Sequence, residues 1–429
     1  MLVEFTVANF RSFQDAMTLS MVAANLVAKD KTVDTSNLIK TDSEISLLKT
    51  AVIYGANASG KSNLLKALLF MKSFMVNSSK ESQSTDKIGV EPFKLGLYGE
   101  TSPSHFELVF IMDGTRYRYG FEADRNRVSA EWLFYVPSSR ETSVFSRKDN
   151  VIAVSKKFDA EGIDKRTRNN ALYLSVCAQF NVPLAEKILA WVSDKLNVLS
   201  GLLDHQYRNY TAGSCDTDAN RLRISSLIKA LDTGISGITV ERNTLGIDSL
   251  PSAMPEELKK LITRGSDSFT QVSVKTTHKK YGNDGSFVGE EEFDMDENES
   301  DGTQKLFALA GPLLNALNEG EVLLIDELDS RLHPLVTLAI IRLFSEVESN
   351  SKNAQLIFVT HDTNLLDKSL FRRDQIWFTE KNRYGATSLY SLAEFKIRND
   401  ASFGSDYIKG KYGAIPFIGS LDIKASPYV

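Results

Sequence analysis

Residues 55 to 62 have the composition of a loop that binds nucleotide phosphates. They read Gly-Ala-Asn-Ala-Ser-Gly-Lys-Ser, a complete match to G-x-x-x-x-G-K-[ST]. Gly55 and Gly60 let the backbone turn so that successive N–H groups face one concavity, beside the positive end of a helix. Lys61 would reach the β- and γ-phosphates, and Ser62 would ligate Mg²⁺. The sequence therefore predicts a nucleoside triphosphate site that uses ATP and Mg²⁺.

The segments on both sides of the loop favour the same interpretation. The apolar run Ala51 to Tyr54 predicts a strand before it, and Asn63 to Leu68 predicts a helix after it. The alternative is a glycine-rich turn that matches the pattern by coincidence. We expect nucleotide contacts along the whole loop, from Gly55, Ala56, Asn57, Ala58, Ser59, Gly60, Lys61, Ser62 and Asn63.

A second run supplies the acids that such a site needs. The four apolar residues Val322 to Ile325 lead directly into Asp326 and Glu327. This pattern is typical of a buried parallel strand that presents acids at the carboxyl edge of a sheet, where ligands bind in open α/β folds. Asp326 would hold Mg²⁺ through water, and Glu327 would orient and polarise the attacking water. The alternative is a buried strand that ends in a solvated acidic turn.

Two further features extend this predicted site. Lys61 and Asp326 are 265 positions apart, so a large insertion must separate the two motifs. Gln355 to Thr360 predicts another strand, and His361 at its end can donate a hydrogen bond to the γ-phosphate.

A second phosphate-binding helix start precedes the acidic strand. In Glu299 to Leu306, Ser300 is placed as an N-cap, Gly302 lies beside it and an apolar helix follows. One ATP needs only one such cradle. We therefore expect this segment to complete the site of a neighbouring molecule.

The order of the motifs resembles the ABC-type ATPase heads of the SMC, Rad50, RecF and OLD group. The resemblance implies an α/β head with a parallel P-loop sheet, an N-terminal antiparallel β-subdomain and an inserted, mostly helical lobe. It places Ser300 and Gly302 in the signature motif, Asp329 in the D-loop and His361 as the switch histidine.

The same resemblance implies two more nucleotide-site residues. Arg11, in the opening segment Ala8 to Phe13, would lie near the nucleotide. Gln179 would sense Mg²⁺ where the core meets the inserted lobe, although a lone glutamine at a helix start is usually just solvated.

Within this group, the chain is more similar to bacterial AAA-type ATPases of abortive-infection and restriction-linked loci, of the AbiLi and RloA kind. The ATPase of the PARIS phage-defence system is related to these. The likeness implies a regulatory ATPase that senses infection or foreign nucleic acid and controls a separately encoded nuclease or toxin through a head-to-tail homodimer or a higher homo-oligomer. The segments that carry it are Glu299–Leu306, Asp326–Pro334, Ala354–Thr363, Arg372–Phe378 and Tyr407–Pro416.

The alternative is a DNA-repair ATPase or an OLD-type nuclease. Only 68 residues follow His361, too few for the Toprim nuclease domain that OLD proteins append, and they contain no D-x-D pair after a strand. Ile376 to Glu380 and Thr387 to Leu392 instead predict closing strands of the ATPase sheet. Nuclease activity within this chain is therefore not expected.

We expect three segments: an N-terminal ATPase lobe (1–180), an inserted lobe (181–290) and a C-terminal ATPase lobe (291–429). In the first, a hairpin turns at Asp113-Gly114, and Trp132 to Val136 continues its sheet. The insert shows helical spacing over 184–196 and 222–231. It lacks sustained heptads and is interrupted at Pro251 and Pro255, so a compact lobe or lid is expected.

Charge and composition limit the partners. The 429 residues are 42% apolar, and only two are cysteines, Cys177 and Cys215, which favours a reducing cytosol. No stretch could span a bilayer, and Met1 to Phe5 begins a strand, so a cytoplasmic protein without membrane contact is expected. A net charge of −5 argues against DNA binding by bulk electrostatics.

Two charged clusters have open interpretations. A basic group could form a nucleic-acid patch, although such a group is more often a solvated loop: Lys156, Lys157, Lys165, Arg166 and Arg168. An acidic group could bind a partner or a metal, or could be the solvated face of a strand: Glu290, Glu291, Glu292, Asp294, Asp296, Glu297 and Glu299.

Overall fold

The computed structural model describes residues 1–416 except 27, 29, 43–44, 82, 98, 138–139, 203–204, 232, 248–249, 251–253, 256, 258–267 and 399–400. Pro251 lies outside the described residues. The chain forms two compact units. The first comprises Met1–Leu199, Glu319–Leu328 and Ile341–Val429, and the second comprises Ser200–Asn318 and Asp329–Ile340.

A six-stranded sheet in the first unit carries the predicted phosphate loop. Four central strands, β15, β16, β5 and β17, are parallel, and β18 runs antiparallel to β17 at one edge. Strand β5 is buried at all five positions, as is expected of a parallel strand covered on both faces. The strands, in sheet order, are β11 (Leu196–Ser200), β15 (Val322–Asp326), β16 (Gln355–Val359), β5 (Thr50–Tyr54), β17 (Ile376–Lys381) and β18 (Thr387–Ser391).

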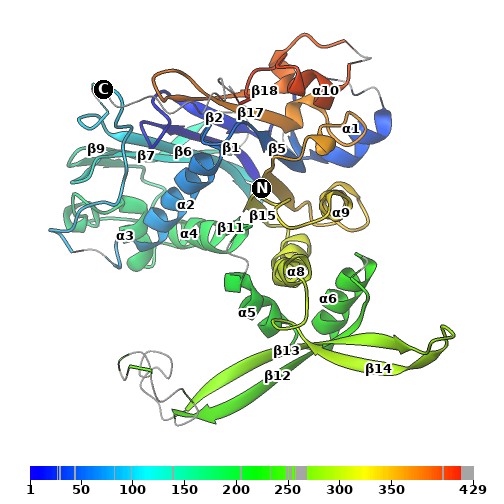
Figure 1. The fold of residues 1–429 in the computed structure, drawn as a ribbon. Helices are drawn as coiled ribbons and strands as arrows, with labels where there is room; N and C mark the ends of the chain where they lie inside the picture. The colour runs from blue at the N-terminus through cyan, green and yellow to red at the C-terminus, as the bar shows by residue number, and fades with distance from the viewer. Residues whose placement is uncertain are drawn as a thin grey trace, which may run out of the picture. The chain divides into compact units, whose positions relative to one another are not determined.

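A seven-stranded antiparallel sheet, visible beside it in Figure 1, forms the β-subdomain. The predicted hairpin is confirmed, because Asp113 and Gly114 both have positive φ, 50° and 74°, which a type I′ turn requires. The strands, in sheet order, are β10 (Val151–Val154), β9 (Thr142–Lys148), β8 (Val128–Val136), β7 (Thr115–Ala123), β6 (Ser104–Met112), β1 (Leu2–Ala8) and β2 (Met17–Ser20).

Helix α2 (Lys61–Asn77) follows the phosphate loop and packs on the β-subdomain (Figure 1). Its Phe70 ring lies 5.0 Å from that of Phe106, and its Phe74 ring lies 5.4 Å from that of Phe121. Tilted aromatic pairs at this separation attract one another beyond the area they bury. The packing fixes the axis of the helix whose N-terminus faces the loop.

The other elements of the first unit surround these sheets. The expected helical spacing over 184–196 corresponds to α4. The remaining helices and strands are α1 (Lys31–Asn37), β3 (Leu38–Lys40), β4 (Ser46–Leu48), α3 (Tyr173–Gln179), α4 (Pro183–Lys195) and α10 (Phe403–Ile408), and α9 (Pro334–Ser345) runs across the boundary between the two units.

Both cysteines are free and buried. Burial raises the pKa of Cys177 to about 12 and that of Cys215 to about 11. Because the thiolate is the reactive form, both side chains behave as small apolar groups at neutral pH.

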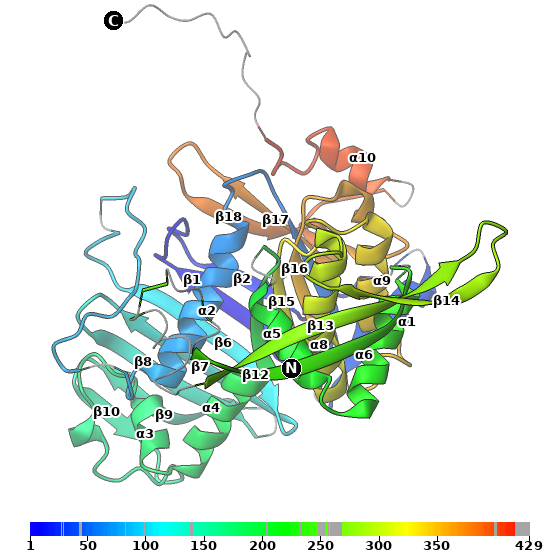
Figure 2. The same ribbon diagram turned by 60° about the horizontal axis from the view of Figure 1, so that its bottom comes forward.

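The second unit combines helices with a three-stranded antiparallel sheet that the sequence did not predict (Figure 2). The acidic positions Glu290, Glu291 and Glu292 lie exposed on β14, so this part of the acidic group is on a solvated strand, whereas Glu299 follows the strand and its side chain is only 8% exposed. The elements are α5 (His205–Ser214), α6 (Asp218–Ala230), β12 (Ile235–Gly246), β13 (Ser268–Tyr281), β14 (Phe287–Asp294) and α8 (Asp301–Glu319).

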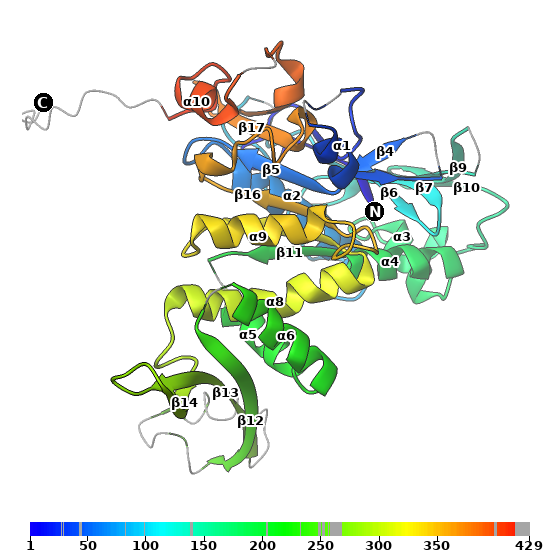
Figure 3. The ribbon, with the colours of Figure 1, turned by 90° about the vertical axis from the view of Figure 1, so that its right-hand side faces the viewer.

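Helices α5 and α8, seen side by side in Figure 3, meet where α8 contains a proline. Pro312 has no N–H for the carbonyl of Ala308, four residues earlier. The Thr211 hydroxyl donates to that carbonyl oxygen at 2.8 Å and accepts from Gly311 N at 3.1 Å. A Cβ at position 311 would lie 2.5 Å from this hydroxyl, so glycine allows the close approach.

Thr211→Val should therefore destabilise the second unit, because Ala308 O and Gly311 N lose a buried partner. We expect a loss of about 1–3 kcal/mol in the free energy of unfolding, measured by urea denaturation. Ser214→Ala is the matched control, since its hydroxyl donates to Tyr210 O within α5 itself. Equal stability of the two variants would contradict this account of α8.

Candidate nucleotide site

Three parallel strands bring the predicted polar residues to one edge of the six-stranded sheet. Ile325 of β15 pairs with Phe358 of β16, which pairs with Val52 of β5. The strands therefore end almost level, and their next residues are the acids, His361 and the phosphate loop. The register explains how segments more than 250 positions apart in the chain reach one site.

The phosphate loop is an open turn that ends in a helix. Asn57 and Ala58 at its tip are exposed, and Ala58 has a φ of 62°. Gly60 has a φ of 114° and is the N-cap of α2. Lys61 is buried beneath the loop, and its Nζ donates to Gly55 O at 2.7 Å and to Ala56 O at 3.0 Å. The ammonium group is thus held inside the turn where phosphates would bind.

The two glycines are required because β17 and β18 approach the loop closely. A Cβ at Gly55 would lie 2.4 Å from Thr379 O, and a Cβ at Gly60 would lie 2.4 Å from Thr387 Oγ1. Neither distance is possible for a real side chain. The loop is therefore fixed by its neighbours as well as by its own sequence.

A chain of hydroxyl groups joins the loop to these strands. Ser59 Oγ lies 2.7 Å from Thr379 Oγ1. Thr387 Oγ1 lies 2.7 Å from Ser59 O and 2.9 Å from Ser12 Oγ, which also accepts from Asn63 Nδ2 at 2.8 Å. Ser12, Thr379 and Thr387 were not predicted from the sequence as supports of the loop. The available signal was the presence of threonines in the strands predicted to close the sheet. Their contacts with the loop could not be predicted, because these contacts depend on the order of the strands in the sheet.

Asp326 and Glu327, at the end of β15, differ in what makes each of them unusual. Asp326 Oδ1 is a buried oxygen without a hydrogen-bond partner among the described residues. An unpartnered buried carboxylate oxygen is costly unless a cation or water satisfies it. Glu327 has a φ of 53°, a left-handed backbone that residues with a Cβ rarely adopt and that clusters at functional sites.

The residues present fit Mg²⁺. Hard oxygen ligands suit this ion, which usually keeps several waters and binds through one or two carboxylates plus substrate phosphates. Asp326 offers the unpartnered carboxylate oxygen, and Ser62 offers a hydroxyl in the first turn of α2.

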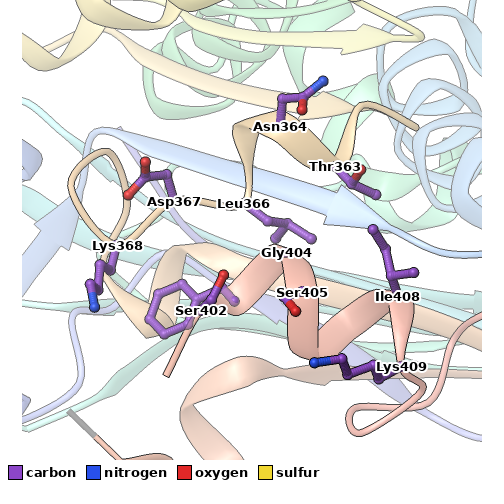
Figure 4. Close-up of a pocket in the computed structure, with 11 residues that line it drawn as sticks. Thr363, Asn364, Leu366, Asp367, Lys368, Ser402, Gly404, Ser405, Ile408 and Lys409 are labelled. Atoms are coloured by element: carbon purple, nitrogen blue, oxygen red, sulfur yellow. The ribbon is translucent and has the colours of Figure 1, made fainter. Parts of the chain in front are cut away.

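His361 is exposed just beyond β16. Its neighbour Asp362 is tied down, because its carbonyl accepts from Tyr54 OH at 3.0 Å and its Oδ1 accepts from Asn364 N at 2.9 Å. A groove of about 600 Å³ begins two residues after His361. Figure 4 shows it between residues 363–368 and α10, with Lys368 and Lys409 among its lining side chains.

The predicted signature residues and Asp329 belong to the second unit. Thr303 N donates to Ser300 Oγ at 3.2 Å, which confirms Ser300 as the cap of α8. A Cβ at Gly302 would lie 2.7 Å from Arg331 O, so the start of α8 contacts the turn that follows Asp329.

Lys305 fastens that contact from within α8. It is fully buried, and its Nζ donates to Ser330 O at 2.7 Å and to Ser330 Oγ at 2.9 Å. Lys305 was not predicted as a functional residue, although a lysine within an apolar helix was a usable signal. The two predicted dimer-facing segments are thus locked together within the second unit.

Arg11 and Gln179, the two further residues implied by the resemblance, lie outside the phosphate loop. Arg11, with a φ of 50°, forms an ion pair with Glu91 at 2.6 Å, and its neighbour Ser12 contacts the loop. Gln179 is the last residue of α3, so the description of it as lying at a helix start is wrong. The apolar residues that precede Gln179 are those of this short helix, which ends at Gln179.

A family model described as "AAA domain, putative AbiEii toxin, Type IV TA system" matches residues 51–172 and 225–367. The chain belongs to this AAA-domain family. The match begins in β5 and ends just after His361, so it includes the phosphate loop, the signature segment and both acids. The parallel sheet that carries the phosphate loop and the antiparallel β-subdomain agree with the α/β head expected from the sequence.

Similarity to solved structures is low in sequence. The SMC head domain from Thermotoga maritima shares 14% identity over 92% of this chain and 99% of that chain, with a TM-score of 0.40. An Smc head bound to the C-winged helix domain of ScpA shares 12% over 91% and 97%, with a TM-score of 0.45. The recombination mediator protein RecF shares 15% over 91% and 98%, with a TM-score of 0.32.

None of the curated proteins searched matches this sequence. Within the described part of the chain, no helix is long and apolar enough to cross a membrane.

Several acids near β14 are in ion pairs within the second unit: Glu291 with Lys280 at 2.8 Å, Asp294 with Lys275 at 2.9 Å and Asp296 with Arg208 at 2.7 Å.

Gly60→Ala should abolish tight ATP binding, because the added methyl group meets Thr387 and the φ of 114° disfavours alanine. We expect at least a hundredfold increase in Kd, measured by calorimetry. Gly89→Ala is the matched control, since its Cβ would meet no atom within 4 Å. Wild-type affinity in the Gly60 variant would show that ATP does not use this loop.

Proposed function

We propose that this protein binds and hydrolyses ATP with Mg²⁺ at the edge where β5, β15 and β16 end. The observation that carries the proposal is the alignment of these three strands, which sets the phosphate loop, Asp326 and Glu327 at one level. Membership of the AAA-domain family supports the same activity.

Each side chain has a definable task in this chemistry. Lys61 leaves its loop carbonyls to contact the β- and γ-phosphates, and the loop N–H groups hold phosphate oxygens. Asp326 and Ser62 would hold Mg²⁺, which neutralises charge on the transferring phosphoryl group. Glu327 accepts a hydrogen bond from the attacking water and orients it in line with the leaving oxygen.

Hydrolysis in this proposal requires two copies of the chain. Ser300 and Gly302 begin a capped helix of 19 residues, and its N-terminus offers N–H groups to an anion. The partner copy would place them against the γ-phosphate bound by the first copy, in a head-to-tail dimer. Specific activity should then rise with protein concentration until dimers predominate.

Glu327→Gln and Lys61→Ala should separate binding from hydrolysis. Each should lower kcat by at least a hundredfold, because each removes one preorganised group of the transition state. Glu327→Gln should keep ATP and accumulate as a dimer, whereas Lys61→Ala should lose ATP. Phosphate release, ATP titration and sedimentation measure the three properties.

Lys66→Ala serves as the control for the lysine change, because Lys66 is exposed on the same helix. Hydrolysis at the wild-type rate by Glu327→Gln would refute the role given to this acid. Monomeric Glu327→Gln that encloses ATP by itself would refute the shared site.

We further propose that the ATP cycle controls a separately encoded effector, a nuclease or other toxin, in defence against phage. The description of the matched family, which names a toxin and a toxin–antitoxin system, supports this setting. The test is to express the chain with the product of the adjacent reading frame and challenge the cells with phage. Protection that depends on both genes and is lost with Lys61→Ala is expected; protection by the chain alone would refute effector control.

A further inference from the structure

The segment that leads into α8 is fastened to strand β13. Residues 295–299, here called the approach turn, connect β14 to the signature residues. Met295 N donates to Val274 O at 3.0 Å, and the Met295 side chain is fully buried. The turn is therefore joined to β13 of the same unit by a backbone hydrogen bond.

The last residue of the approach turn makes the closest polar contacts with that sheet. Glu299 Oε1 lies 2.5 Å from Thr276 Oγ1 and 2.7 Å from His278 Nε2. The Glu299 side chain is 8% exposed, and Thr276 is fully buried. Thr276 and His278 are two residues apart on β13, so both donors project from one face of the sheet.

The His278 ring is itself held in place. It lies 4.8 Å from the ring of Phe293 on β14, and its cross-strand neighbour on that strand is Glu291. Thr276 Oγ1 is also near Phe293 O, at 3.5 Å. The two side chains that contact Glu299 are thus held in place by their neighbours on β14.

Movement of Glu299 would be passed directly to the signature residues. Ser300 is its next neighbour, and Ser300 Oγ accepts from Thr303 N. Gln304 Nε2 donates to both Asp296 O and Glu299 O at 3.1 Å, which ties the first turn of α8 back to the approach turn. The cap, the first helical turn and the approach turn therefore shift as one piece.

We propose that Glu299 is a positioning residue for ATP hydrolysis. Its carboxylate, held by Thr276 and His278, sets the backbone of Ser300 and Gly302 for contact with the nucleotide of a second copy. The inference rests on the proposed two-copy site. It also implies a role for the three-stranded sheet. Any ligand or substitution that displaces β13 should change the rate of ATP hydrolysis through the Glu299 carboxylate.

The test compares Thr276→Val with Thr276→Ser. Valine keeps the shape and removes one donor to a buried carboxylate, so kcat should fall about tenfold. KM for ATP should stay near the wild-type value, because the phosphate loop is untouched. Serine restores the hydroxyl and should restore most of kcat. In a Glu327→Gln background, Thr276→Val should bind ATP normally yet form fewer dimers by sedimentation.

Three further substitutions define the outcome. Glu299→Gln keeps an acceptor oxygen and should retain most activity, whereas Glu299→Leu should lose it. Lys280→Ala, an exposed position on the same strand paired with Glu291, should leave kcat unchanged. Thermal unfolding confirms that each variant is folded.

Failure of this inference differs from failure of the proposed function. If the wild type forms ATP-dependent dimers and Thr276→Val matches it in kcat and dimer fraction, Glu299 is not a positioning residue. If the wild type hydrolyses ATP as a monomer, the two-copy site itself is wrong. A loss in Thr276→Val that appears in KM or in ATP affinity would also overturn the assignment, since the contact would then act on the phosphate loop.

Discussion

The parallel pairing of β15, β16 and β5 is the constraint on which the rest of the site depends. Parallel strands buried on both faces must carry apolar side chains along their length, so polar groups can appear only where the strands end. Since Ile325, Phe358 and Val52 are in register, the three ends coincide. The chemistry is therefore concentrated at one edge of the sheet, and the buried strands hold that edge rigid.

Polar contacts with little tolerance for change fix the local geometry at a few points within each unit. The phosphate loop turns beneath Thr379 and Thr387 at distances that exclude a Cβ, and Thr211 takes the place of the N–H that Pro312 lacks. Lys305 joins the start of α8 to the turn after Asp329 within the second unit. Buried groups of this kind are costly to leave unpaired, so each acts as a local lock on geometry.

The second unit has a sheet whose strands do not follow the apolar periodicity of a core. Strand β14 is largely exposed and acidic, and β12 has a long exposed stretch. Period-two alternation was weak there, so strand pairing could not be predicted from the residues alone. The sheet is instead defined by a long ladder between β12 and β13 and by the ion pairs that join β13 to β14.

Local sequence was enough to predict the phosphate loop, the strands that lead to Asp326 and His361, the hairpin at Asp113 and the cap at Ser300, because each depends on local backbone chemistry or on an uninterrupted apolar run. Tertiary structure alone decided the contacts of Ser12, Thr387, Lys305 and Glu299, and it corrected the place of Gln179. The physical reason is distance along the chain: Ser12 and Thr387 are 375 positions apart, and only the order of the strands brings their hydroxyl groups to 2.9 Å.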